Sequence, residues 1–293
     1  MRDPLRVRCI VRAPPPLRRT RSRGERVAAY AGPVGERITV DRDGHVLLIG
    51  LNRPDKRNAA DFAMLQELCL AYGELDRDEH LRAAVVFAHG DHFTAGLDLA
   101  DVGPRITDDG LDIVPPGGIN PWQVDGTNVR KPVVIAVQGT CYTLGIELAL
   151  ASDVVVAADS TVFGQIEVQR AILPFGGATI RLPRAIGWGN AMRWMLTGDT
   201  FDAAEAHRLG LVQEVVPHGD QLPRAHELAH RIAAQAPLAV QATLASARQA
   251  ARHGEEMAEK GLQRELVRLA ATEDAAEGMR AFLSRTEPRF QGR

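Results

Sequence analysis

The sequence contains little cysteine and almost no net charge. Its three cysteines, Cys9, Cys69 and Cys141, form no CxxC pair and lack the spacing of metal ligands. This usage suits a reducing compartment and argues against a structural zinc site. The formal net charge of -2 gives no global positive field to attract nucleic acid and no strong negative field to repel acidic substrates. Partners must therefore be inferred from local features, and nucleic acid is not expected.

A long uninterrupted apolar run is also absent. The most apolar region, Pro132 to Ala158, is broken by Gln138, Glu147 and Asp153. It falls short of the roughly 20 apolar residues that a membrane-spanning helix needs. We therefore expect a soluble protein without a membrane partner, and we place it in the cytoplasm.

The first 35 residues differ in kind from the rest. Residues 1–26 carry nine arginines against two acidic residues and include three consecutive prolines, with no sustained helical or strand period. We predict that residues 1–35 form an extension that does not pack. A targeting segment is a second interpretation, although transit peptides are also serine-rich and amphipathic. A basic arm that touches nucleic acid or anionic lipid is a third.

The remaining pattern predicts an α/β core over residues 36–220 and a helical region over residues 221–293. Strand patterns cover residues 37–41, 45–51, 82–88, 131–138, 153–157 and 211–216. Helical patterns cover residues 60–75, 143–151, 181–195 with a break near Gly187, and 202–209. Asp61, Asp98 and Asp202 are placed to cap a helix or turn. The alternation of strand, helix and strand indicates right-handed crossover units.

Two further segments have a distinct composition. Residues 223–283 consist almost wholly of helix-forming residues, interrupted at Pro237 and Gly254, which predicts successive helices. Residues 103–127 hold four prolines and five glycines with little periodicity. This composition predicts a long loop, and loops of that length are usually functional lids or disordered segments.

Two glycine-containing bends offer free backbone amides. At Ala95-Gly96-Leu97 and at Leu144-Gly145 a strand gives way to a bend before a helical turn, which leaves amide groups without intrahelical partners. If the bends face each other, two amides can point at one oxygen, which is the geometry of an oxyanion hole. Ordinary turn chemistry explains either bend taken alone.

Two glutamates lie among apolar residues. Glu147 falls in the first turn of its predicted helix, where the helix dipole favours an anion. Glu167 follows a predicted turn centred on Gly164. Two such carboxylates can divide general acid and general base work when their environments differ. The alternative is that each forms a structural ion pair, for example with Arg170 or Arg181, and spacing alone leaves both interpretations open.

Other reactive side chains favour plainer interpretations. His89 and His92 flank Gly90 and could be metal ligands, but no cluster of cysteine or histidine accompanies them. Solvent-facing or hydrogen-bonded histidines are the favoured interpretation, and no metal site is predicted. Cys141 has no histidine close in sequence, so we interpret it as a small buried residue.

Several motifs together resemble one family. The segments HGDHFTAGLDLADV, GTCYTLGIELALASDVVVAADSTVFGQIEV, PFGGATIRLPRAIG and MLTGDTFDAAEAHRLGLVQEVV are similar to successive signature blocks of the enoyl-CoA hydratase/isomerase (crotonase) family, in the same order and spacing. NRPDKRNA resembles its first CoA-contacting loop, and GMRAFLSRTEPRF resembles its C-terminal end. The likeness covers residues 36–293. It implies an α/β fold built as a spiral of repeated β-β-α units, with a C-terminal all-helical oligomerisation region.

The resemblance also implies a reaction. It places the oxyanion-hole amides at Leu97 and Leu144 and the two hydratase glutamates at Glu147 and Glu167. In that family water adds across the double bond of a 2-enoyl-CoA and gives a 3-hydroxyacyl-CoA, a step expected in fatty acid metabolism. Glu147 would activate the water, and Glu167 would deliver a proton to the α-carbon. No cofactor is implied, since coenzyme A is part of the substrate.

Further residues receive roles from the same resemblance. The CoA-contacting positions are Lys56, Arg57, Ala95, Phe282 and Arg285, the last two of which could act on a neighbouring subunit. Aromatic side chains at Trp122 and Phe175 are expected to line the acyl pocket. The family forms trimers or pairs of trimers through its helical tail, so self-association as a homotrimer or a dimer of trimers is expected.

Some positions depart from the family pattern. Thr143-Leu144-Gly145 replaces a glycine run, Ile166 replaces a proline, and Phe175 stands where glycine is frequent near the water. Two alternatives to hydration follow. One is an enoyl-CoA double-bond isomerase, which needs only one of the glutamates. The other is a low-activity CoA-thioester-binding or RNA-binding member that uses the arginine-rich N-terminus as its arm.

Overall fold

A six-stranded sheet forms the centre of the protein. The computed structural model describes residues 37–124 and 127–293, so the predictions for residues 1–35 lie outside the described residues. The strand order is β1-β2-β3-β4-β6-β9; β1 is antiparallel to β2, and the other neighbours are parallel. The strands are β1 (Ile38–Asp43), β2 (Val46–Leu51), β3 (Ala83–Ala88), β4 (Val133–Val137), β6 (Val154–Ala158) and β9 (Glu214–Val216).

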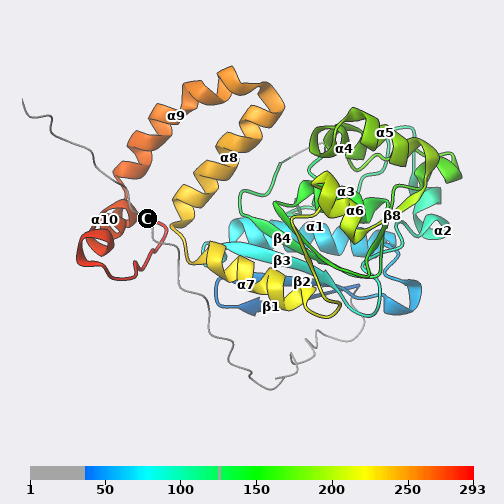
Figure 1. Cartoon of the computed structure of the whole chain (residues 1–293), viewed down its shortest axis with the longest axis horizontal. Helices are drawn as coiled ribbons and strands as arrows, with labels where there is room; N and C mark the ends of the chain where they lie inside the picture. Colours follow the sequence, from blue (N-terminus) through cyan, green and yellow to red (C-terminus); the bar gives the residue numbers. More distant parts are fainter. Residues whose placement is uncertain (1–36, 125–126) are drawn as a thin grey trace, which may run out of the picture. The chain divides into compact units, whose positions relative to one another are not determined.

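The central strands are apolar because helices cover both faces of the sheet. Every residue of β2, β3 and β4 is buried, as expected for parallel strands covered on both sides. Helix α1 (Phe62–Arg77) packs on β1 and β2, while α7 (Gln221–Ala233) packs on β3, β4 and β6 (Figure 1). The predicted strands and the first helix are confirmed with shifts of up to three residues at their ends.

A second, smaller sheet is not predicted from the sequence. It consists of β5 (Thr140–Tyr142), β7 (Val162–Gly164) and β8 (Thr200–Asp202), with β5 parallel and β8 antiparallel to β7. The prediction of a turn centred on Gly164 is wrong, because Gly164 ends β7 and pairs with Tyr142 and Thr200. Strands of three residues are too short to show a period of two.

Short helices follow the strands of the core. They are α2 (Leu99–Val102), α3 (Leu144–Ala151), α4 (Ala178–Ile186), α5 (Trp188–Thr197) and α6 (Ala203–Leu209). The predicted break at Gly187 separates α4 from α5. Asp61 caps α1 and Asp202 caps α6, each by accepting a backbone N–H, as predicted. Asp98 does not cap α2; its carboxylate instead accepts from Arg53 Nη2 at 3.2 Å.

The C-terminal quarter is helical, as predicted. After α7 come α8 (Pro237–His253), α9 (Glu255–Ala270) and α10 (Glu273–Ser284), with interruptions at Pro237 and Gly254. Arg248 of α8 forms an ion pair with Asp153 at 3.0 Å. None of the described helices combines the length and the apolar character that crossing a bilayer requires. The boundary predicted at residue 220 stays a prediction, and α7 packs on the central sheet.

Candidate active site

The two predicted bends lie side by side. Thr94 and Cys141 form a parallel bridge, in which the amide of Thr94 donates to Thr140 O and the amide of Tyr142 donates to Thr94 O, both at 3.0 Å. The chain that leads into Leu97 therefore runs next to the chain that leads into α3. The two bends are therefore adjacent, and the oxyanion hole that they would form together stays a prediction.

Close packing between the bends explains the glycine at position 96. Gly96 has φ of +105°, and a Cβ at this position would lie 2.3 Å from Thr143 Oγ1. Thr143 itself adopts φ of +49°, which is an outlier conformation for a β-branched residue. Such strain persists only where the surroundings impose it, and it concentrates at functional sites.

The bends leave two backbone amides without acceptors. Neither Leu97 N nor Leu144 N has a hydrogen-bond acceptor within residues 37–124 and 127–293. Leu144 is the first residue of α3, so its N–H has no partner inside the helix. Trp122 Nε1 donates to Leu144 O at 2.9 Å and thereby holds the second bend in place. The assignment of the two amides as an oxyanion hole stays a prediction that this arrangement supports.

Glu147 is a buried carboxylate that forms no ion pair with any described residue. Its side chain is 3% exposed, and Oε1 accepts the amide of Ala178 at 3.1 Å, at the start of α4. Burial raises its pKa to about 7, and the amides of Ala178 and Gly176 together with the charge of Arg181 oppose that rise. The favourable dipole of its own helix is therefore outweighed by desolvation.

Glu167 is the second buried carboxylate. It begins a short 3-10 turn, η3 (Glu167–Arg170), and Gln165 Nε2 donates to its Oε1 at 2.8 Å. Its Oε2 is buried and accepts no hydrogen bond from any described residue. Burial, with a smaller contribution from the negative charge of Glu147, raises its pKa to about 7. An unsatisfied buried oxygen is expensive, so a water or ligand that donates to this atom would lower the cost of its burial.

The structural ion-pair alternative is not supported in the described part of the chain. No salt bridge there involves Glu147 or Glu167. The guanidinium of Arg181 donates to the carbonyls of Gly176 at 3.2 Å and Gln123 at 3.1 Å. Arg170 donates to the carbonyl of Gln169 at 3.0 Å. Both arginines thus bond to backbone oxygens, and neither carboxylate has a cation within bonding distance.

One cavity joins these groups. It has a volume of about 200 Å³ and is reached by both glutamates and both bends. Its lining includes the predicted residues Ala95, Leu97, Trp122, Leu144, Glu147, Glu167 and Phe175, and a mainly apolar remainder formed by Leu65, Leu99, Leu111, Ile113, Thr143, Ile166, Arg170, Ile172 and Gly176. The structure therefore brings the predicted acid/base, amide and acyl-pocket residues to one place. An apolar cavity with few polar groups is the usual form of a small-molecule site.

The predicted CoA-contacting residues divide into two groups. Lys56 and Arg57 are exposed in the 3-10 turn η1 (Pro54–Lys56) and just after it, and Ala95 N donates to Arg57 O at 2.9 Å. This loop is therefore attached to the first bend. Phe282 and Arg285 are exposed at the end of α10 and do not line the cavity. Contact of either group with CoA stays a prediction.

Sequence reasoning missed several residues of the site. Gln165 and Gly176 touch the carboxylates, while Leu111 and Ile113 reach the cavity from the long loop that follows α2. None of them belongs to a periodic pattern. For Gly176, the sequence signal was the glycine pair at positions 176 and 177, because glycine allows another group to approach the backbone closely.

The histidines next to Gly90 behave as hydrogen-bonded residues, as favoured above. His89 Nε2 lies 2.8 Å from Thr39 Oγ1, and His92 Nδ1 accepts the amide of Thr140 at 3.1 Å. Burial lowers the pKa of His89. Cys141 is fully buried, and burial raises the pKa of its thiol well above the usual range. Its interpretation as a small packed residue agrees with this environment.

Comparison with known proteins gives the family. A model of the enoyl-CoA hydratase/isomerase family matches residues 41–293. The enoyl-CoA hydratase EchA19 of Mycobacterium tuberculosis is 35% identical over 88% of this chain and 98% of its own length. The 2,3-dehydroadipyl-CoA hydratase of Escherichia coli is 37% identical over 87% of this chain and 99% of its own length.

Solved structures of similar fold point to the same family. A crystal structure described as a probable enoyl-CoA hydratase/isomerase from Mycobacterium abscessus has a TM-score of 0.85 at 57% identity, covering 88% of this chain and 99% of that one. An enoyl-CoA hydratase from M. tuberculosis has a TM-score of 0.79 at 34% identity, with coverage of 88% and 99%. The chain belongs to the enoyl-CoA hydratase/isomerase family. The crotonase-like α/β fold and the hydro-lyase class inferred from the motifs are confirmed.

Proposed function

We propose that this chain hydrates the double bond of a 2-enoyl-CoA thioester and forms a 3-hydroxyacyl-CoA. The observation that carries the proposal is the pair of buried glutamates. They share one cavity with two amides that lack acceptors, and neither glutamate has a cationic partner among residues 37–124 and 127–293. Hydration requires a base for the water, an acid for the α-carbon and a site for the developing negative charge on the thioester oxygen. The cavity supplies a candidate for each.

The two glutamates take the roles of base and acid. Because their pKa values are both raised to about 7 and the charge of Glu147 raises that of Glu167, the two carboxyl groups together carry about one proton near neutral pH. Ionised Glu147 accepts a proton from water as the water oxygen bonds to the β-carbon. Protonated Glu167 gives its proton to the α-carbon. The addition of water neither oxidises nor reduces the substrate overall, so the step needs no redox cofactor.

The amides of Leu97 and Leu144 stabilise the intermediate. Addition of oxygen to the β-carbon turns the thioester into an enolate whose charge gathers on the carbonyl oxygen. Donors that are already oriented toward this oxygen need no reorganisation during the reaction, and loss of one such donor typically costs about 10²–10³ in rate. Trp122 supports this function indirectly, because it fixes the carbonyl of Leu144.

Substrate binding and assembly complete the proposal. The exposed cations Lys56 and Arg57 suit the phosphates of CoA, and the loop that carries them is bonded to Ala95 at the edge of the cavity. Helices α9 and α10 expose Leu262, Leu266, Val267, Met279, Phe282 and Leu283. Apolar surface of this extent favours burial between copies of the chain. We propose a homotrimer or a dimer of trimers that acts in the cytoplasm on acyl-CoA intermediates of fatty acid metabolism.

A double-bond isomerase is the main competing function. An isomerase needs one carboxylate that removes and returns a proton, whereas hydration uses two. Both glutamates reach the cavity with raised pKa values, and this favours hydration. A binding protein that relies on the arginine-rich extension is a third possibility, and its key residues lie outside the described residues.

The test is a spectrophotometric assay with purified protein. Incubation with crotonyl-CoA and with longer 2-enoyl-CoAs should remove the absorbance of the conjugated thioester. Glu147→Ala and Glu167→Ala should each reduce the rate by about 10²–10⁴, while Glu79→Gln on the exposed surface should not change it. Undiminished hydration in both alanine variants would overturn the assignment. Removal of residues 1–35 should leave the hydration rate unchanged. A truncated protein that loses its ligand binding while the full chain hydrates no 2-enoyl-CoA would support the binding-protein alternative.

A further inference from the structure

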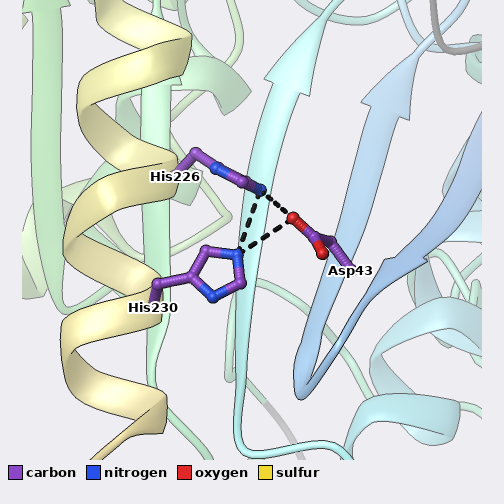
Figure 2. A group of neighbouring side chains, drawn as sticks. All are labelled: Asp43, His226 and His230. Atoms are coloured by element: carbon purple, nitrogen blue, oxygen red, sulfur yellow. Dashed lines mark hydrogen bonds and ion pairs between the residues drawn. The ribbon is translucent and has the colours of Figure 1, made fainter.

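Three side chains that can act as metal ligands meet outside the cavity. Asp43 ends β1, and His226 and His230 lie four residues apart on α7, so that both imidazoles project from the same face of the helix (Figure 2). None of the three lines the proposed active site. Residues 43 and 226 are distant in sequence, and only the packing of α7 on the sheet brings them together.

The distances between the three atoms match the coordination of a small cation. Asp43 Oδ2 lies 2.8 Å from His226 Nε2 and 3.1 Å from His230 Nε2, and the two Nε2 atoms are 3.2 Å apart. In a tetrahedral zinc site with ligands at 2.0–2.1 Å, neighbouring ligand atoms are about 3.3 Å apart. The three atoms therefore form nearly one face of such a tetrahedron without rearrangement.

Hydrogen bonding alone satisfies this arrangement poorly. If both imidazoles donate from Nε2 to Asp43 Oδ2, two N–H groups converge on one oxygen while their nitrogens lie only 3.2 Å apart. If one Nε2 is instead an acceptor, it loses its bond to the carboxylate. A cation at the centre of the triangle removes the conflict, because each neutral imidazole and the carboxylate then offer it one lone pair.

Neighbouring charges leave the carboxylate free for this role. Arg42 precedes Asp43 in β1 and so points to the opposite face of the sheet, where it binds Glu74 at 2.6 Å and Asp78 at 2.7 Å. On α7, Arg224 is paired with Glu214 and Glu227. Within the described part of the chain, no arginine or lysine forms an ion pair with Asp43.

We propose that Asp43, His226 and His230 form a Zn²⁺ site. Two imidazole nitrogens and one carboxylate oxygen suit zinc, and the partial exposure of all three side chains leaves the fourth position open to water. The ion joins the β1–β2 hairpin to α7. It therefore crosslinks the first strands of the fold to the first helix of the C-terminal region. It binds the folded chain and not the unfolded one, so it raises the melting temperature.

The experiment uses full-length protein without a polyhistidine tag, stripped of metal with a chelator. Zn²⁺ added in the presence of a competing chromophoric chelator should bind one ion per chain. Co²⁺ should give the intense visible absorption of a tetrahedral nitrogen and oxygen site. At hundredfold excess over the dissociation constant, Zn²⁺ should raise the melting temperature by roughly 5 °C.

Single substitutions locate the site. Asp43→Asn and His226→Ala should each weaken Zn²⁺ binding by at least about tenfold and remove the thermal shift, while His253→Ala, an exposed histidine on α8, should change neither. Hydration by the metal-free variants at low temperature should equal that of the metal-free parent, which shows that the variants are folded. Absence of stoichiometric binding, or equal binding by all three variants, would overturn the proposal.

Discussion

A Cβ atom on Gly176 would lie 2.5 Å from Oε2 of Glu147. Gly176→Ala should therefore displace the Glu147 carboxylate and lower kcat for hydration by one to two orders of magnitude, because small misplacements of a catalytic group are costly. Steady-state kinetics with crotonyl-CoA measure the effect. Gly189→Ala is the matched control, since nothing lies within 4 Å of a Cβ placed there. Equal kcat in both variants would contradict the proposed role of Glu147.

The raised pKa values of Glu147 and Glu167 predict a bell-shaped pH profile for the hydration rate. Hydration should fall below neutral pH, when both Glu147 and Glu167 are protonated, and above it, when both are ionised, because each pKa is raised to about 7. Glu147→Gln removes a negative charge that raises the pKa of Glu167, so Glu167 should titrate at lower pH in this variant. NMR of labelled glutamate side chains measures that shift. An unchanged titration of Glu167 would show that the carboxylates do not interact.

The same burial predicts a conflict between stability and activity. The folded state holds the Glu147 proton more tightly than the unfolded state, whose pKa lies near 4.5, so stability falls as pH rises from about 4.5 to about 7. Glu147→Gln cannot ionise and should be more stable than the parent at pH 8 by roughly 1–3 kcal/mol. Below pH 4.5 this advantage should vanish.

Denaturant unfolding at pH 8 and at pH 4.5 measures the difference. Glu79→Gln on the exposed surface should leave the free energy of unfolding unchanged at both values. A Glu147→Gln variant that is less stable than the parent at pH 8 would mean that the hydrogen bond from Ala178 outweighs the burial of the charge.

Relief of backbone strain is expected at position 143. Thr143 has φ of +49°, a conformation that glycine adopts without steric penalty. Strain of this kind amounts to about 1–3 kcal/mol, whereas glycine loses roughly 0.5–1 kcal/mol of unfolded-chain entropy. Thr143→Gly should therefore raise the melting temperature or leave it unchanged, and Thr143→Val, which keeps the β-branch, should not raise it. A clear drop for the glycine variant would show that the contact of Thr143 with Gly96 outweighs the strain.

Much of the fold follows from local sequence, because the central strands are continuous apolar runs and the caps act within three residues. The small sheet does not, since each of its strands has three residues and is defined by partners far along the chain. The contact made by Asp98 likewise depends on a residue distant in the sequence. It has the position of a helix cap, yet Arg53, a residue 45 positions earlier, binds its carboxylate.

Part of the residue set that the structure gathers at the cavity was predictable, but the surroundings of these residues were not. The motifs name Glu147 and Glu167 through family resemblance, and the cavity contains both. Neither the amide of Ala178 beside Glu147 nor the amide of Gln165 beside Glu167 could be inferred, because no spacing rule connects them. The cluster of Asp43 with His226 and His230 was missed for a similar reason, as its members approach only through the packing of α7 on the sheet.

Two kinds of backbone segment line the cavity. The carboxylates and amides sit on short helices and on bends bonded to strands, whereas Leu111 and Ile113 come from the irregular stretch that follows η2 (Gly103–Arg105). Replacement of side chains in that stretch alters the shape offered to the acyl group while the reacting groups keep their supports. Exchange of this single segment between relatives is therefore a route to new acyl preferences that leaves the hydration chemistry intact.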